Sequence, residues 1–217
     1  TGYWFTPATR TYTNVTSNMF AQDYTTTSSP TFFVDNTNPN CTDVGTVGSF
    51  AVPFCTIGRG AYLAIAGNIV HVIHGTYAET VYPRNNGSAG HPIIFQADPG
   101  VTVTGQPGTP TVAYSAFAVS LKSYVVIDGF NIYNTSSKGI YVDSSDHITI
   151  SNNHVSLAGA SSQFHPYEQG IYLKNTTYST ITGNITDHNT CIGIRLLNNS
   201  DYNLVSNNFS FSNFSVV

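Results

Sequence analysis

The sequence has 217 residues, of which 41% are hydrophobic and only 8% are charged, and its formal net charge is −4. Soluble domains carry about 25% charged residues, so we expect a surface built from uncharged polar side chains and tyrosine. The lack of any Lys/Arg cluster excludes nucleic acid as a partner. No apolar run reaches the roughly 20 residues that a transmembrane helix needs. A composition poor in lysine and rich in aromatic residues is typical of an extracellular or cell-surface protein.

Residues 1–30 precede the repeats described below and are expected to form an N-terminal extension. The stretches Gly2–Pro7 and Arg10–Val15 resemble the last strands of a bacterial carboxypeptidase-regulatory-like, Ig-type β-sandwich. The resemblance implies a remnant of a preceding sandwich, followed by a linker over Thr25–Pro30. The first residue is Thr1 and no signal peptide is present, which is typical of a processed or excised chain.

Residues 31–66 are expected to cap the N-terminal end of the next domain. A strand is expected at Phe32–Val34 and a short helix at Gly60–Ala66. Cys41 and Cys55 enclose a short loop, and a disulfide between them would stabilise the fold by on the order of 3 kcal/mol. The alternative is two free thiols.

Residues 67–217 contain a repeat of short β-branched strands separated by Gly, Asn and Ser. Equivalent positions Phe117, Ile140, Ile171 and Ile194 are 23, 31 and 23 residues apart, and an insertion over Ala158–Gln169 explains the long interval. A 23-residue unit of this kind is too short to bury a core of its own but can form one coil of a solenoid. The pattern predicts an all-β fold, a right-handed parallel β-helix of about 23 residues per coil, with an uncapped C-terminal end.

Side chains alternate between the two faces of a strand, which assigns one inward column to Phe117/Ile140/Ile171/Ile194. A second inward column is Val119/Val142/Leu173/Leu196 and a third is Ile127/Ile150/Ile181/Val205. Asn153, Asn184 and Asn208 recur at one turn, which predicts a ladder of side-chain amides along the axis. The rival fold is an antiparallel sandwich, but it needs recurring hairpin turns, and the Asn86-Gly87 pair does not recur.

Several segments also resemble a known group of proteins. Four segments are similar to the start of secreted bacterial right-handed parallel β-helix proteins with a pectate-lyase-like fold: Val34–Cys41, Pro53–Ile57, His74–Glu79 and Pro92–Ala97. Such proteins include lyases of uronate polysaccharides, glycoside hydrolases, epimerases and large surface proteins. The resemblance therefore implies the fold and leaves the activity open.

The outward columns beside the first inward column hold the candidate binding residues. One column is Ala118/Tyr141/Tyr172/Arg195 and the next is Ser120/Asp143/Lys174/Leu197, while the insertion adds His165, Tyr167 and Glu168. Aromatic rings stack on sugar faces and arginine pairs with a uronate carboxylate. The expected substrate-binding residues are Tyr141, Tyr172, Arg195 and Glu168.

A uronate lyase would need a cation on the substrate carboxylate and a base for the adjacent C–H proton. Arg195 or a bound calcium ion could supply the cation, and Lys174, Tyr172 or His165 could supply the base. The alternative is an ordinary solenoid surface without catalytic residues. Asp143 and Asp146 could help to hold calcium, or they could be solvated turn residues.

Two function hypotheses follow. The first is an extracellular or cell-surface solenoid with a structural or adhesive role, which binds polysaccharide or copies of itself, including end-to-end assembly into a filament. The second is a calcium-assisted polysaccharide lyase. N-glycosylation motifs recur, and some are expected to be occupied if the source organism glycosylates surface proteins; they begin at Asn14, Asn40, Asn86, Asn134, Asn175, Asn184, Asn198, Asn208 and Asn213.

Overall fold

The computed structural model describes residues 4–6, 25–27, 30–46, 48–105, 115–160 and 168–213. It separates into two compact units, residues 1–30 and 31–217. In the first unit, β1 (Trp4–Thr6) pairs antiparallel with β2 (Thr25–Thr27). Thr25–Thr27, the first residues of the expected linker, thus pair as a strand, and the linker itself stays a prediction. The proposed sandwich remnant otherwise falls mostly outside the described residues.

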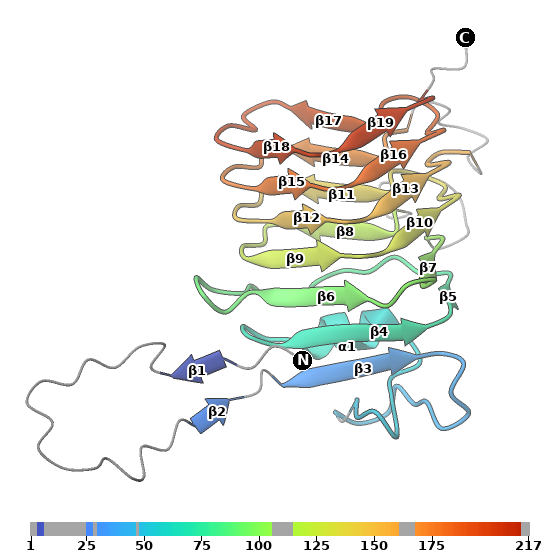
Figure 1. The fold of residues 1–217 in the computed structure, drawn as a ribbon, viewed down its shortest axis with the longest axis vertical. Helices are drawn as coiled ribbons and strands as arrows, with labels where there is room; N and C mark the ends of the chain where they lie inside the picture. The colour runs from blue at the N-terminus through green and yellow to red at the C-terminus, as the bar shows by residue number, and fades with distance from the viewer. Residues whose placement is uncertain are drawn as a thin grey trace, which may run out of the picture. The chain divides into compact units, whose positions relative to one another are not determined.

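The second unit contains three sheets in which every strand pairs parallel with its neighbours (Figure 1). The seven-stranded sheet is β3 (Thr31–Asp35), β4 (Ile69–His74), β6 (Ile93–Ala97), β9 (Val125–Asp128), β12 (Thr149–Ser151), β15 (Thr180–Thr182) and β18 (Leu204–Ser206). The six-stranded sheet is β5 (Thr76–Tyr77), β7 (Thr102–Val103), β10 (Asn131–Tyr133), β13 (His154–Ser156), β16 (Ile185–Asp187) and β19 (Phe209–Phe211). The four-stranded sheet is β8 (Phe117–Ser120), β11 (Ile140–Asp143), β14 (Ile171–Lys174) and β17 (Ile194–Leu197).

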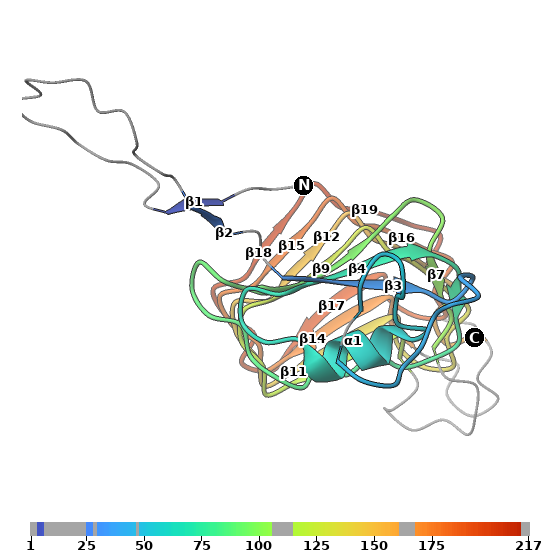
Figure 2. The same ribbon diagram turned by 90° about the horizontal axis from the view of Figure 1, so that it is seen from below.

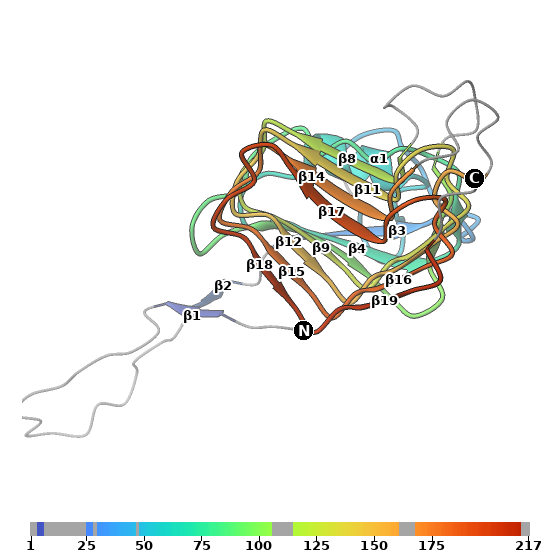
Figure 3. The ribbon, with the colours of Figure 1, turned by 90° about the horizontal axis from the view of Figure 1, so that it is seen from above.

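From β8 onward the chain visits the three sheets in turn to complete each coil, so the second unit is a right-handed parallel β-helix, as predicted (Figures 2 and 3). The strand registers confirm all three inward columns, because Ile140 faces Phe117 and Ile171, and Ile150 faces Ile127 and Ile181. Most side chains of these columns are fully buried, which places the hydrophobic core along the axis between the sheets.

A glycine precedes three of the four strands of the four-stranded sheet, β11, β14 and β17, and it has a steric cause. A Cβ atom on Gly139 would lie 2.2 Å from Cγ1 of Val155 and 2.6 Å from the carbonyl oxygen of Gly170. Neither the packed valine nor the backbone of the next coil can yield that much space. The close approach of successive coils therefore explains why glycine opens the repeat.

The predicted asparagine ladder is present between the seven-stranded and six-stranded sheets. The amide nitrogen of Asn153 donates to Oδ1 of Asn184 over 3.0 Å, and that of Asn184 donates to Oδ1 of Asn208 over 2.9 Å. Asn184 is fully buried, so its side chain satisfies turn groups that water cannot reach. This geometry also removes Asn184 as a glycosylation site, because its amide is not accessible.

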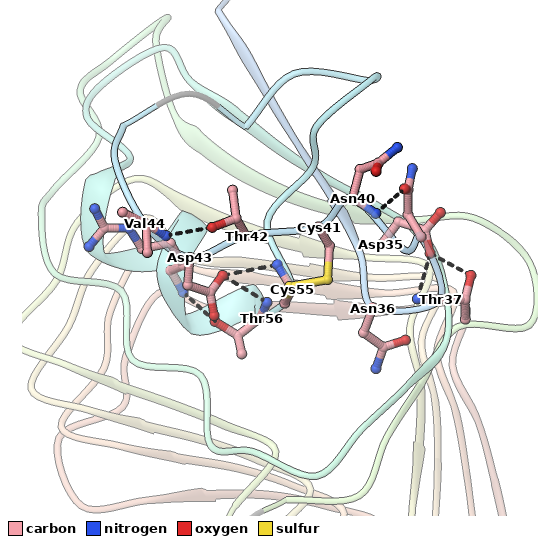
Figure 4. Close-up of a disulfide and its surroundings, with 12 residues drawn as sticks. Asp35, Asn36, Thr37, Asn40, Cys41, Thr42, Asp43, Val44, Cys55 and Thr56 are labelled. Carbon is pink, nitrogen blue, oxygen red and sulfur yellow. Dashed lines mark hydrogen bonds between the residues drawn. A yellow bond between two sulfur atoms is a disulfide. The ribbon is translucent and has the colours of Figure 1, made fainter.

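The N-terminal cap is organised around helix α1 (Ile57–Leu63), which begins three residues before the expected Gly60. The Thr56 hydroxyl caps the helix, while Asp43 accepts bonds from the backbone and hydroxyl of Thr56. The predicted disulfide joins Cys41 to Cys55, with their Cα atoms 5.0 Å apart (Figure 4). The alternative of two free thiols is therefore wrong, and the bridge holds the capping loop beside the start of α1.

Stacked aromatic rings line the corner between the four-stranded and seven-stranded sheets. Tyr124, His147, Tyr178 and Tyr202 follow one another, with ring centroids 4.5, 5.6 and 5.1 Å apart. All four residues have a positive φ, so this corner turns the chain through the left-handed region in each of these four coils. The rings cover one another's faces within the stack, which stabilises the stacking of successive coils.

Candidate functional site

The outward face of the four-stranded sheet brings together the tyrosines and the arginine that the sequence pointed to. Tyr141 of β11 lies opposite Tyr172 of β14, which lies opposite Arg195 of β17. The two rings stack with centroids 5.7 Å apart, and the guanidinium carbon of Arg195 lies 5.6 Å from the centroid of the Tyr172 ring. Because all three are partly exposed, this column presents aromatic and cationic groups to solvent.

An ion pair that the sequence analysis missed lies beside this column, where the chain enters β11 and β14. The ammonium of Lys138 is 2.7 Å from Oε2 of Glu168, and the two side chains are only 13% and 8% exposed. Lys138 also lies 6.0 Å from the Tyr141 ring centroid and 5.9 Å from that of Tyr172. The sequence feature that could have indicated this ion pair is the position of Lys138 directly before the repeat glycine Gly139. This position places Lys138 beside the coil that carries the insertion.

The opposite end of the face is organised by Asp143. Its carboxylate accepts hydrogen bonds from the hydroxyls of Tyr141 and Ser144 and from the amide of Asn175, and the ammonium of Lys174 lies 3.8 Å away. Partial burial opposes ionisation of Asp143, but these hydrogen bonds and the lysine outweigh it, and its pKa lies below the ordinary value. Asp143 is therefore a charged anchor that holds its neighbours in position.

The two stacked tyrosines differ in what their hydroxyl groups can do. Burial raises the pKa of Tyr141, and the hydrogen bond to the charged Asp143 raises it further. That phenol remains protonated and acts as a fixed donor. At Tyr172, no hydrogen bond engages the hydroxyl within the described part of the chain, so it is open to a ligand.

The remaining candidates are placed as follows. Glu168 does not face solvent as a binding residue would, because it is buried against Lys138. Lys174 lies on the outer face beside Asp143. His165, like Tyr167, lies outside the described residues. The described structure therefore joins Tyr141, Tyr172 and Arg195 into one surface, with Lys138 and Glu168 beside it.

Metal ligation finds little support in the described residues. They contain no group of three or more His, Cys, Asp or Glu side chains that could hold a metal ion. Asp146 accepts hydrogen bonds from the His147 ring and the Ser123 hydroxyl, which offset the effect of burial and lower its pKa. The carboxylate of Asp143 already binds Tyr141, Ser144 and Asn175. Both carboxylates that could help to hold calcium therefore already have protein partners.

Two further histidines share one carboxylate on the six-stranded sheet. Nε2 of His154 lies 2.7 Å from one oxygen of Asp187, and Nδ1 of His188 lies 2.8 Å from the other. Burial acts against ionisation of Asp187, but the two hydrogen bonds prevail and lower its pKa. One ring nitrogen of each histidine is thus already paired with the carboxylate.

Fold and surface together define a right-handed parallel β-helix with an aromatic and basic face on its four-stranded sheet. Comparison with known proteins then gives the family: the chain belongs to the family described as periplasmic copper-binding protein (NosD), which matches residues 83–217. No helix within the described residues is long and apolar enough to cross a membrane.

Individual relatives share the fold over part of their length. The uncharacterized protein YwoF of Bacillus subtilis (strain 168) is 32% identical over 133 residues, which are 54% of this chain and 27% of YwoF. The GH136 lacto-N-biosidase from Eubacterium ramulus superposes with a TM-score of 0.55 at 13% identity, over 72% of this chain and 34% of that one. A rhamnogalacturonan lyase gives a TM-score of 0.45 at 14% identity, over 84% of this chain and 62% of the lyase.

The chain therefore spans about a quarter of YwoF and a third of the biosidase. At 13% identity, the likeness to the biosidase concerns the fold alone.

Proposed function

We propose that this chain is a carbohydrate-binding β-solenoid module that works outside the cytoplasm and holds an acidic polysaccharide without cleaving it. The observation that carries the proposal is the stack of Tyr141, Tyr172 and Arg195 on the outer face of the four-stranded sheet. Aromatic side chains bind sugar rings, and a guanidinium that makes no ion pair with any described residue can bind a sugar carboxylate. The proposed role is structural or adhesive.

The location rests on two observations. The family is described as periplasmic, and disulfides such as Cys41–Cys55 form and persist in oxidising compartments. Both are consistent with an extracellular or periplasmic location. The family description also names copper, but the described residues lack a suitable group of ligands, so copper binding is not part of the proposal.

Binding to polygalacturonate and alginate, with dextran as a neutral comparison, tests the proposal. Tyr172→Ala and Arg195→Gln should each weaken binding by about tenfold or more, because each removes one charge-assisted or stacking contact. Tyr133→Ala is the matched control, since Tyr133 is 45% exposed on the six-stranded sheet. Equal affinity of Tyr172→Ala, Arg195→Gln and wild-type protein would reject this face as the binding site.

The lyase hypothesis remains the second candidate, and the open hydroxyl of Tyr172 beside Arg195 favours it. In such a reaction the base takes the proton next to the carboxylate, the bond between the neighbouring carbon and the glycosidic oxygen breaks, and a carbon–carbon double bond forms. The leaving oxygen takes up a proton from the protonated base or from water. Ultraviolet absorbance detects the unsaturated ends, and Tyr172→Phe should abolish their formation while retaining the ring. A wild-type protein that binds the acidic polymers and never releases unsaturated products would exclude cleavage.

Self-association is a separate proposal for the coil formed by β18 and β19. Val205 continues the inward column of Ile150 and Ile181, both fully buried, yet it is 46% exposed, and Phe209 is 63% exposed. A second copy of the chain could cover this surface. Sedimentation of wild-type protein and Val205→Glu should then differ, whereas Leu121→Glu, at a site already 72% exposed, should behave as wild type. A monomer at every concentration would refute this proposal.

A further inference from the structure

The outward face of the four-stranded sheet continues toward the N-terminal cap. Val81 forms a parallel bridge with Phe117, and its carbonyl accepts from the backbone of Ala118. Val81 thus extends the buried column of Phe117 and Ile140 by one coil. The next residues alternate in exposure, with Tyr82 and Arg84 exposed and Pro83 buried between them. Tyr82 and Arg84 therefore lie on the same face as Tyr141, Tyr172 and Arg195.

Helix α1 supplies the neighbouring element at that end. The backbone N–H of Arg84 donates to the carbonyl of Ala61 in α1, and the figures show α1 in line with the strands of the four-stranded sheet (Figures 2 and 3). The guanidinium carbon of Arg84 lies 4.2 Å from the ring centroid of Tyr62, and that of Arg59 lies 5.7 Å from the same centroid. We call Arg59, Tyr62, Tyr82 and Arg84 the cap-side cluster.

This cluster repeats the chemistry of the proposed site. Every arginine among the described residues lies over a tyrosine ring, and none forms an ion pair with a carboxylate there. The carboxylates near α1 are otherwise engaged, because Glu79 accepts from the backbone of Ile57 and Gly58 and Asp43 from that of Thr56. Stacking on a ring holds a guanidinium in place while leaving N–H groups at its edge for an anion. Arg59 already donates from Nη2 to the carbonyl oxygen of Gly45, so Arg84 is the arginine of this cluster that we assign to the anion.

Small residues separate the two arginine–tyrosine surfaces. The outward positions of β8, between the cap-side cluster and β11, are Ala118 and Ser120. The register runs from Val81 through Phe117, Ile140 and Ile171 to Ile194, which is four coil steps. At about 4.8 Å per step, the two surfaces span roughly 19 Å along the axis. A ligand that reaches both must be a chain that lies along the solenoid.

We infer that the cap-side cluster is a second anion subsite, and that the ligand is a polyanionic polysaccharide bound along the axis between Arg84 and Arg195. The inference rests on the proposed function and adds the orientation and minimum length of the ligand. Linking two weak contacts through one chain raises the local concentration at the second, so a long polymer binds much more tightly than a fragment. The charge contribution should weaken as salt increases.

The test compares polygalacturonate with digalacturonate, a fragment too short to span both subsites. Arg84→Gln and Arg195→Gln should each lower the affinity for polygalacturonate by about tenfold or more. Wild-type protein should take up two digalacturonate molecules per chain, and either variant should take up one. Lys122→Gln is the matched control for loss of one positive charge, and circular dichroism confirms that each variant is folded.

The outcomes separate this inference from the proposed function. Wild-type affinity in Arg84→Gln together with a loss in Arg195→Gln would overturn the second subsite and leave the proposed function intact. A stoichiometry of one digalacturonate in wild-type protein would also overturn it. If wild-type protein binds neither polygalacturonate nor alginate, the proposed function fails and the inference fails with it.

Discussion

Replacing Lys138 with methionine should destabilise the solenoid strongly, because it leaves the buried carboxylate of Glu168 without its counter-charge. The two charged atoms are 2.7 Å apart and both side chains are largely buried. Removing one partner of a buried ion pair costs about 3–5 kcal/mol. Lys174 provides a matched comparison on the same face, since it lies 3.8 Å from Asp143 and is 35% exposed. Lys174→Met should therefore cost no more than about 1 kcal/mol.

Chemical denaturation followed by far-ultraviolet circular dichroism is the appropriate assay. Circular dichroism follows the strands of the solenoid themselves, whereas Trp4, the one tryptophan in the chain, belongs to the first compact unit. The double variant Lys138→Met/Glu168→Leu should recover most of the lost stability, since apolar residues often replace a buried ion pair without penalty. The single and double variants together form a cycle that isolates the pair from other effects.

Two results would refute this reasoning. If Lys138→Met and Lys174→Met cost the same, burial does not distinguish the two ion pairs. If the double variant is no more stable than Lys138→Met, the loss comes from the lysine stem and its packing beside the tyrosines rather than from the unpaired carboxylate.

Three further predictions concern the fold. Asn184→Ala should lower the free energy of unfolding by about 2–4 kcal/mol in chemical denaturation, because it leaves buried turn groups without partners. A loss of less than about 0.5 kcal/mol would contradict the role of the ladder. Cys41→Ser/Cys55→Ser should cost about 3 kcal/mol, and reductant should lower the midpoint of wild-type protein but not of the variant. Because folding lowers the pKa of Asp143 and Asp187, both carboxylates add stability above the unfolded-state pKa of about 3.9, and this stability is lost as pH falls through their folded-state values. The denaturation midpoint of wild-type protein should therefore drop on acidification, and that of Asp187→Asn should drop less steeply. If the midpoint of Asp187→Asn falls with pH as steeply as that of wild-type protein, Asp187 does not contribute to the acid sensitivity.

The fold was predictable because its signal is repeated. Each coil places a β-branched or aromatic residue at the same register, so Ile140, Ile171 and Ile194 independently report one column. Glycine and asparagine recur for steric and hydrogen-bonding reasons that act on every coil, as Gly139 and Asn184 show. The strand at Thr25–Thr27 was missed because a short threonine run resembles a linker when its partner lies about 20 residues away.

The candidate site was only partly predictable. Strand alternation placed Tyr141, Tyr172 and Arg195 on one face, but it could not show that Glu168 is buried or that Lys138 is its partner. That pair depends on where the chain re-enters the coil after the insertion. The cap-side cluster was missed for a similar reason, since Tyr62 belongs to a helix and Arg84 to an irregular segment, and neither follows the repeat.

The sequence by itself determined the coil, its inward columns, the asparagine ladder and the disulfide, because each depends on spacing along the chain and on side-chain chemistry that recurs or is local. The tertiary structure alone decided which charges are buried, which hydroxyl is occupied and which of the described arginines lack a carboxylate partner. Those properties arise where separate coils and the cap helix meet. Contacts between such segments set burial and local charge, and these determine what the outer face can bind.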